Sequence, residues 1–201
     1  MQLVYLAIVL APLVGAIAAG VFGRQLGRTG AHWVTIGLVG LATALSGFVL
    51  AGFMWGSREP VDATVYTWMT AGGIHFEVGF LVDELTALMM AVVTFVSLMV
   101  HIYSVGYMAD EDHNWPATSL LRECAYQRFF AYISLLTFAM LMLVMANNFM
   151  QLFFAWEAVG LVSYLLIGFW MNRSTAVFAN LKAFLVNRVG DLGFLLGIGV
   201  V

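Results

Sequence analysis

Six long apolar segments constrain the fold of this chain more than any other feature of its sequence. Each contains 17–23 residues, which is the length that an α-helix needs to cross the hydrocarbon core of a bilayer. Inside a bilayer a helix satisfies its own backbone hydrogen bonds, so these segments predict an all-α polytopic membrane protein. The predicted helices occupy residues 3–22, 33–55, 85–107, 129–145, 149–170 and 179–201.

The composition agrees with a membrane protein and excludes several other classes. Hydrophobic residues make up 63% of the chain and charged residues only 9%, whereas soluble domains contain about 25% charged residues. The few cations form no basic patch, so no nucleic-acid partner is expected. Cys124 is the only cysteine, which excludes a disulfide or a cysteine-ligated cluster within the chain. We expect no cofactor in this chain and a lipid bilayer around it.

The loops between the predicted helices assign a side of the membrane to each end of the bundle. The turn at residues 146–148 is short and polar, which predicts that the fourth and fifth helices form an antiparallel hairpin. The loops on the opposite side to this turn are richer in cations, with Arg24, Arg28, Arg122, Arg128 and Arg173. Because such cations accumulate in cytoplasmic loops, Met1 and the loop at residues 56–84 are predicted to face outward.

Three local signals lie in the longer loops. Thr64–Met69 and Ile74–Phe80 are rich in β-forming residues and have glycines between them, which predicts a short outward β-hairpin between helices two and three. Asp83 is predicted to cap the third helix, because its carboxylate can accept the free N–H groups at the amino end of a helix. Residues 108–127 are polar and acidic, and we expect a solvated loop there.

The most informative single residue is Glu157, in the middle of the apolar segment 149–170. An ionised carboxylate near the membrane midplane costs at least about 2.5–3.5 kcal/mol, so it needs a partner, a water-filled cavity or a function. Gly160, Tyr164 and Gly168 share its helix face, which suits close packing against another helix rather than against lipid. We interpret Glu157 as a proton-handling residue, and a purely structural ion pair is the alternative.

The sixth segment carries a second set of charged residues. Arg188 and Asp191 are spaced i, i+3 on a face shared with Asn180 and Asn187, so they can form an ion pair. That pair is either a static salt bridge or part of a proton relay. Lys182 lies on nearly the opposite face, where it either reaches the cytoplasmic interface or contributes to proton transfer. With Arg188 assigned to Asp191, the cation that partners Glu157 is expected from later helices.

Two histidines, His32 and His101, are predicted near the cytoplasmic ends of the second and third helices. Two such residues are able to ligate a haem iron, which would make the protein an electron carrier. Hydrogen bonding near the membrane interface, or a peripheral part in proton transfer, is the favoured interpretation.

Three stretches of the sequence resemble a known family. They are FLVDELTALMMAVVTFVSLMVHIYSVGYM at residues 80–108, YQRFFAYISLLTFAMLMLVMANNFMQLFFAWEAVGLVSYLLIGFW at 126–170 and KAFLVNRVGD at 182–191. All three are similar to subunit L of the proton-pumping NADH:quinone oxidoreductase, respiratory complex I, whose mitochondrial counterpart is NADH dehydrogenase subunit 5. The motifs WEAVGLVSYLLIGFW and NRVGD are the specific part of this resemblance, and residues 1–80 fit more loosely.

The resemblance implies an antiporter-like subunit that translocates protons in the membrane arm of the complex, in the bacterial inner membrane. The central protonatable glutamate of the family's W-E motif corresponds to Glu157, and the family's helix-six acid and arginine correspond to Asp191 and Arg188. The family's central lysine lies on a seventh helix. Other membrane-arm subunits are the implied partners, and NADH, flavin, iron–sulfur clusters and quinone are implied in partner subunits.

Family members differ from this chain in two respects. They continue for many more helices, so we expect this chain to be a truncated, N-terminal part that does not pump protons alone. The loop around Asp112–Cys124 is also expanded relative to the family.

Two further classes of protein remain as alternatives. A subunit of a multisubunit sodium/proton antiporter shares the W-E helix and has no redox coupling, but NRVGD fits subunit L better. A purely structural membrane-arm protein would use Glu157 and Asp191 only as packing pairs.

Overall fold

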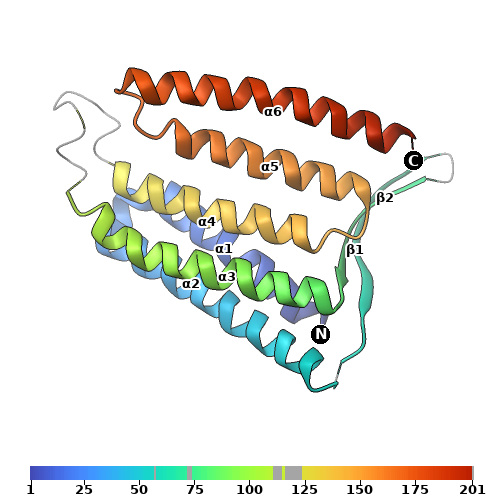
Figure 1. Ribbon diagram of the computed structural model, residues 1–201. Helices are drawn as coiled ribbons and strands as arrows, with labels where there is room; N and C mark the ends of the chain where they lie inside the picture. Colours follow the sequence, from blue (N-terminus) through green and yellow to red (C-terminus); the bar gives the residue numbers. More distant parts are fainter. Residues whose placement is uncertain (57, 72–73, 111–114, 116–123, 201) are drawn as a thin grey trace.

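The computed structural model describes residues 1–56, 58–71, 74–110, 115 and 124–200 of the chain. Within them six helices are long and apolar enough to cross a membrane, and a two-stranded sheet lies at one end of their bundle (Figure 1). This architecture confirms the predicted fold class. The elements are α1 (Gln2–Val21), α2 (Gly23–Met54), β1 (Val61–Ala71), β2 (Ile74–Val82), α3 (Glu84–Tyr107), α4 (Ala125–Val144), α5 (Phe149–Ile167) and α6 (Ser174–Val200).

Three helices begin earlier than their apolar segments predict. α2 begins at Gly23 rather than at residue 33, although Gly27 interrupts it with a φ of 68° and a ψ of −174°. Glycine adopts this backbone conformation readily, so the first turn of α2 is offset from the rest. α4 begins at Ala125 rather than at residue 129, and α6 begins at Ser174 rather than at residue 179. Polar residues extend these helices because a span must be apolar only within the hydrocarbon core.

The first four helices form the closely packed part of the bundle. α1 and α3 both lie against α2 and α4, and α5 lies against the other side of α4. Their apolar core is densest near the sheet, where it includes Tyr5, Ile8, Val49, Met90 and Leu141. α6 lies at the edge of the bundle against α5, and Asp191 is its only buried residue (Figure 1). Because the buried residue of α6 is acidic, the contact between α5 and α6 is the candidate functional site.

The β-hairpin is longer than predicted and holds the connection between α4 and α5. Its strands pair antiparallel from Val61 opposite Val82 to Ala71 opposite Ile74, while Gly72 and Gly73 lie outside the described residues. The backbone N–H of Leu81 donates to the carbonyl of Met145 at 3.0 Å. The side-chain amide of Asn148 donates to the carbonyl of Glu77 at 2.9 Å. These bonds hold the start of α5 against the hairpin. The position of Glu157 further along α5 depends on this attachment.

The expectation of a solvated loop over residues 108–127 agrees with the exposure of Ala109 and Asp110 but is wrong for the other described residues of this stretch that are buried. Met108 and Trp115 are buried, and residues 125–127 belong to α4, whereas residues 111–114 and 116–123 lie outside the described part. Trp115 packs edge-on against Phe169 with ring centroids 5.9 Å apart, and the guanidinium of Arg128 lies 5.2 Å from the Trp115 ring. Aromatic and cation–π contacts therefore bury this tryptophan at the end of the bundle.

Asp83 caps α3 as predicted. Its Oδ1 accepts a hydrogen bond from the backbone N–H of Thr86 at 2.7 Å. This bond holds the pKa of Asp83 below its usual value. Because the folded-state pKa is the lower one, the cap stabilises the helix above the unfolded-state pKa, and this stability is lost as the pH falls through the folded-state pKa.

We expect Asp83→Ala to weaken the first turn of α3 by about 0.5–2 kcal/mol at neutral pH, because a free N–H group loses its acceptor. Amide hydrogen exchange at Thr86 should then be roughly 2–30-fold faster, and the difference should disappear in acid. Asp83→Asn is the matched control, because it keeps an acceptor oxygen, and it should exchange at nearly the original rate. Unchanged exchange in Asp83→Ala would show that the cap contributes nothing.

Candidate functional site

The structure brings three of the four predicted site residues together between α5 and α6. Glu157 lies in the middle of α5, and Arg188 reaches across from α6 so that its Nη2 lies 2.5 Å from Oε2 of Glu157. The same Nη2 lies 3.1 Å from Oδ2 of Asp191, about one turn further along α6. Arg188 therefore bridges two carboxylates that come from two different helices.

This bridge corrects the expectation that the cation of Glu157 comes from later helices. The spacing of Arg188 and Asp191 predicted their ion pair, which is present, but it did not show that the same guanidinium reaches Glu157. The long arginine side chain spans the gap between two packed helices. Sequence periodicity describes only one helix at a time and carries no information on that gap.

Gly168, at the end of α5, is the glycine whose lack of a Cβ atom allows α6 to approach. A Cβ atom added at Gly160 would lie 3.7 Å from Nδ2 of Asn187, and one added at Gly168 would overlap Nδ2 of Asn180. Tyr164 lies between these glycines and packs on Phe184, with ring centroids 5.4 Å apart. The predicted small-residue face of α5 is therefore the face that α6 covers, as small residues commonly allow in membrane helices.

Asp191 is held from a second direction by the residue that precedes Glu157. Nε1 of Trp156 donates a hydrogen bond to Oδ1 of Asp191 at 3.0 Å. The exposed fractions of the side chains are 8% for Asp191, 22% for Glu157 and 41% for Arg188. Trp156, which the sequence analysis did not single out, is thus part of the site, and its place beside Glu157 in the W-E motif was the available signal.

The charges of the cluster do not balance. One guanidinium and two carboxylates give a net charge of −1 when all three groups are ionised. An uncompensated charge is costly in the low dielectric of a membrane interior. One proton bound to either carboxylate would neutralise the cluster while the other carboxylate stays paired with Arg188. The arrangement is therefore suited to binding and releasing a single proton.

Lys182, the fourth predicted site residue, is not brought to this cluster. Its side chain is exposed on α6, nearer than Arg188 to the start of that helix. Among the residues that the structure describes, no group of three or more His, Cys, Asp or Glu side chains is placed to hold a metal ion.

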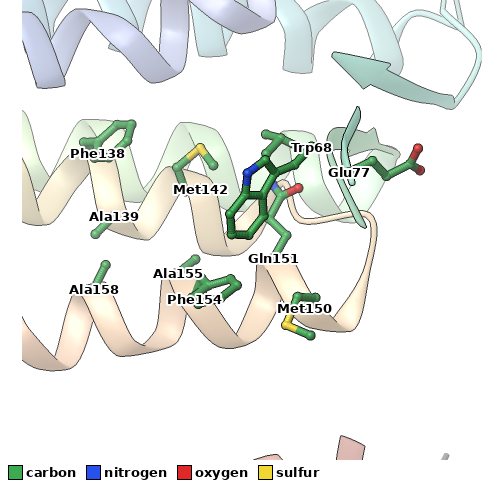
Figure 2. A pocket seen from close by; sticks show the side chains of 11 residues that line it. Trp68, Glu77, Phe138, Ala139, Met142, Met150, Gln151, Phe154, Ala155 and Ala158 are labelled. Carbon is green, nitrogen blue, oxygen red and sulfur yellow. The ribbon is translucent and has the colours of Figure 1, made fainter. Parts of the chain in front are cut away.

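A cavity of about 230 Å³ lies beside the hairpin, between the ends of α4 and α5 (Figure 2). Trp68 of β1 lies across it, and its lining is mainly apolar, with Met142 and Phe154 among the larger residues. Gln151, which lines the cavity, is also bound to the sheet. Its Oε1 accepts a hydrogen bond from the backbone N–H of Gly79 at 2.9 Å. The carboxylate of Glu77 points away from the cavity in Figure 2, so the cavity is an apolar space separate from the charged cluster.

Paired charges between two membrane-crossing helices define a class of polytopic membrane protein with an ion-pair site between its helices. Two family models match this chain and narrow the class. Residues 68–130 match the N-terminus of chain 5 of NADH-ubiquinone oxidoreductase, complex I. Residues 146–201 match the transmembrane domain of NADH:quinone oxidoreductase and the Mrp antiporter. Both models describe antiporter-like membrane subunits.

Individual relatives agree with these models. Subunit L of the NADH-quinone oxidoreductase of Neisseria meningitidis is 63% identical over 98% of this chain and 28% of its own length. Subunit L of Rhodobacter capsulatus is 48% identical over 95% of this chain and 26% of its own length. Chain 5 of Dictyostelium discoideum is 40% identical over 96% of this chain and 27% of its own length. This chain therefore belongs to the subunit L and chain 5 family of complex I, and it spans about a quarter of the length of these relatives.

A solved structure supports the fold. A chain of the membrane-bound sulfane sulfur reductase, an archaeal respiratory membrane complex, superposes with a TM-score of 0.73 over 96% of this chain and 36% of that chain. The two sequences are 18% identical, so the likeness concerns the fold alone.

We expect Arg188→Ala to lower the amount of protein in the membrane more than Asp191→Asn does. Loss of the guanidinium leaves two carboxylates without their shared cation, and the cost stays below the about 3–5 kcal/mol of a fully buried pair because Arg188 is 41% exposed. In Asp191→Asn the new amide oxygen would still accept the hydrogen bond from Trp156. Immunoblots of isolated membranes measure the amounts, with Arg188→Lys as the charge-preserving control. Equal amounts for the Ala and Asn variants would argue against the shared bridge.

Proposed function

We propose that this chain takes part in proton translocation in the membrane arm of an NADH:quinone oxidoreductase, coupled to electron transfer from NADH to quinone in other subunits. The observation that carries the proposal is the carboxylate of Glu157 in the middle of α5, which shares one guanidinium with Asp191 and leaves one negative charge for a proton to neutralise. Relatives that are 63% and 48% identical are subunits L of NADH-quinone oxidoreductases, which supports this assignment over other membrane transporters.

In this proposal Arg188 acts as the switch and Glu157 as the proton acceptor. When the guanidinium is close to Glu157, the ionised carboxylate is stabilised and its proton is released. When the guanidinium moves toward Asp191, Glu157 loses its counter-charge and takes up a proton. Nη2 already lies within 3.1 Å of both acids, so a small displacement changes its preference. Trp156 holds Asp191 in place during this exchange.

The surroundings of the chain follow from the same proposal. The redox groups belong to partner subunits, this chain carries no redox site, and its neighbours are other membrane-arm subunits and lipid. The membrane is the bacterial inner membrane, with Met1 and the hairpin outside. The cations Arg24, Arg28, Arg128 and Arg173 support this orientation, because they lie at the end of the bundle opposite the hairpin. Lys182 lies toward that cytoplasmic end, where it contributes to proton entry.

A sodium/proton antiporter subunit is the second candidate, because the model matched by residues 146–201 includes the Mrp antiporter. The match of residues 68–130 to chain 5 and the identity to subunit L favour the redox-coupled complex. Affinity purification separates the two candidates, because only the favoured one predicts that quinone-reductase subunits copurify with this chain.

We expect Glu157→Gln to remove most proton pumping while leaving assembly largely intact, because glutamine keeps the size and hydrogen bonding of the side chain but cannot ionise. A positioned proton-transfer group contributes about 10²–10⁴-fold in rate, so the loss should be at least roughly tenfold. Glu157→Asp should retain more activity, because the titratable group survives. Proton uptake into membrane vesicles after addition of NADH is the measurement.

Glu84→Gln provides the matched control for this prediction. It makes the same chemical change at an exposed carboxylate in the first turn of α3, away from the cluster. Uptake should stay near the unsubstituted level in this variant. Full pumping in Glu157→Gln would rule out the proposed role of the carboxylate.

A further inference from the structure

A second set of polar side chains lies inside the α2–α3–α4 part of the bundle, away from Glu157. One face of α3 carries Thr94, Ser97, His101 and Ser104, which recur every three or four residues. Thr94, His101 and Ser104 are buried, and Ser97 is half-buried. This polar face runs from the middle of α3 to its predicted cytoplasmic end. Polar and ionisable residues inside a membrane cost free energy, and such residues commonly have a function there.

His101 is fully buried, and its two ring nitrogens have different surroundings. Nδ1 lies 2.8 Å from the carbonyl oxygen of Ser97 and 3.3 Å from its Oγ. Because a carbonyl oxygen can only accept, the contact assigns the ring proton to Nδ1 and leaves a lone pair on Nε2. Nε2 is buried and has no hydrogen-bond partner among the described residues. A buried polar atom without a partner costs about 1–3 kcal/mol.

The donor side of the His101 ring is supported by hydroxyl groups from two helices. Oγ1 of Thr137 donates to the carbonyl of Ile133 at 2.9 Å, so the hydroxyl of Ser97 is the donor in its 2.5 Å contact with Thr137. The lone pairs of Ser97 Oγ are then available to the Nδ1–H of His101. Two oxygen acceptors on this side would stabilise a positively charged ring, because hydrogen bonds to a charged group are stronger than neutral ones.

A second histidine lies toward the predicted cytoplasmic end of the same helices. Nδ1 of His32 on α2 lies 2.9 Å from the hydroxyl of Tyr126 on α4. The buried ring of Phe130 contacts both histidines, with ring centroids 6.1 Å from His32 and 6.2 Å from His101. The two imidazoles therefore share one aromatic neighbour. His32 and Tyr126 supply the polar groups on the other side of Phe130 from His101.

We propose that Nε2 of His101 is a second proton-binding site of this chain, which exchanges protons with water entering from the His32–Tyr126 end. In the loading step a hydronium ion gives one proton to the lone pair of Nε2 and becomes water. In the unloading step the Nε2–H proton returns to water and the neutral ring is restored. The Nδ1–H bond stays intact throughout, and the two oxygen atoms of Ser97 beside it stabilise the positive charge of the ring. This inference rests on the proposed function, in which protons cross the bundle.

The test uses membrane vesicles from cells whose own copy of this chain, in its assembled complex, carries the substitution. His101→Gln keeps a donor and an acceptor at the end of its side chain but cannot bind a proton. We expect the rate of NADH-driven proton uptake to fall at least roughly tenfold, in line with the contribution of a positioned proton-transfer group. Ser97→Ala should cause a smaller, several-fold loss, because the ring keeps its bond to the carbonyl oxygen.

Ser134→Ala is the matched control. Its hydroxyl is buried on the same helix as Thr137 and donates to the carbonyl of Pro12 at 2.7 Å, outside the polar set around His101. We expect uptake to remain within about twofold of the original in this variant, since the loss of one hydrogen bond of about 1 kcal/mol affects stability rather than proton transfer. A loss equal to that of His101→Gln would mean that any buried hydroxyl or imidazole is needed for packing, and would overturn the proposal.

A direct readout of the ring accompanies the uptake assay. Infrared difference spectra of the complex, recorded on addition of NADH with ¹⁵N-labelled histidine, should contain a ring band that is absent in His101→Gln. If that variant does not assemble, the same band must shift in Ser97→Ala. The absence of a histidine band from the unsubstituted complex, or its persistence unshifted in both variants, would overturn the proposal.

Glu157→Gln in the same assay separates this proposal from the function on which it rests. Loss of uptake in Glu157→Gln with full uptake in His101→Gln would overturn the His101 site and leave the proposed function standing. Full uptake in both variants would remove the proposed function and this inference with it.

Discussion

The α5–α6 half of the structure depends on the ion pairs made by the guanidinium of Arg188. This guanidinium is the cation that lies within ion-pair distance of both Glu157 and Asp191, and these acids come from different helices. In a medium of low dielectric two carboxylates cannot stay close and ionised without compensation. The same constraint that ties α6 to α5 also leaves the cluster one positive charge short. In the proposed function a bound proton supplies that charge, so that stability and the proposed function have one physical origin at this site.

The rest of the bundle holds this cluster at a defined depth. The four helices α1–α4 pack against one another, with a large apolar cluster near the sheet, and α5 contacts α4 and β2. Gln151, two turns before Glu157, accepts a hydrogen bond from Gly79 of the hairpin, and Asn148 caps α5 by accepting from the backbone N–H of Gln151. These bonds prevent α5 from sliding along its axis. The hairpin thus helps to hold the helix that carries the Glu157 carboxylate.

The two polar regions of the bundle lie on opposite sides of α4. The acids and Arg188 belong to α5 and α6, whereas His101 and its hydroxyl neighbours belong to α3 and α4. Among the described residues, the first region carries one negative charge more than its cation balances, and the second leaves the lone pair of His101 Nε2 without a partner. In the two proposals made above, a proton occupies each of these positions.

The amino-acid sequence alone determined the six membrane-crossing helices, the hairpin, the Asp83 cap, the Arg188–Asp191 pair and the face of α5 that α6 covers. All of these follow from apolar length, from the 3.6-residue period or from neighbours along the chain, and each acts within one element. Only the tertiary structure decided that Arg188 also reaches Glu157, that Trp156 holds Asp191, that Trp115 is buried and that Nε2 of His101 is left without a partner among the described residues. These features depend on the distance and rotation between helices that are remote in sequence. That geometry is set by which side chains fit against one another, such as Asn180 against Gly168, and no pattern within a single helix contains it.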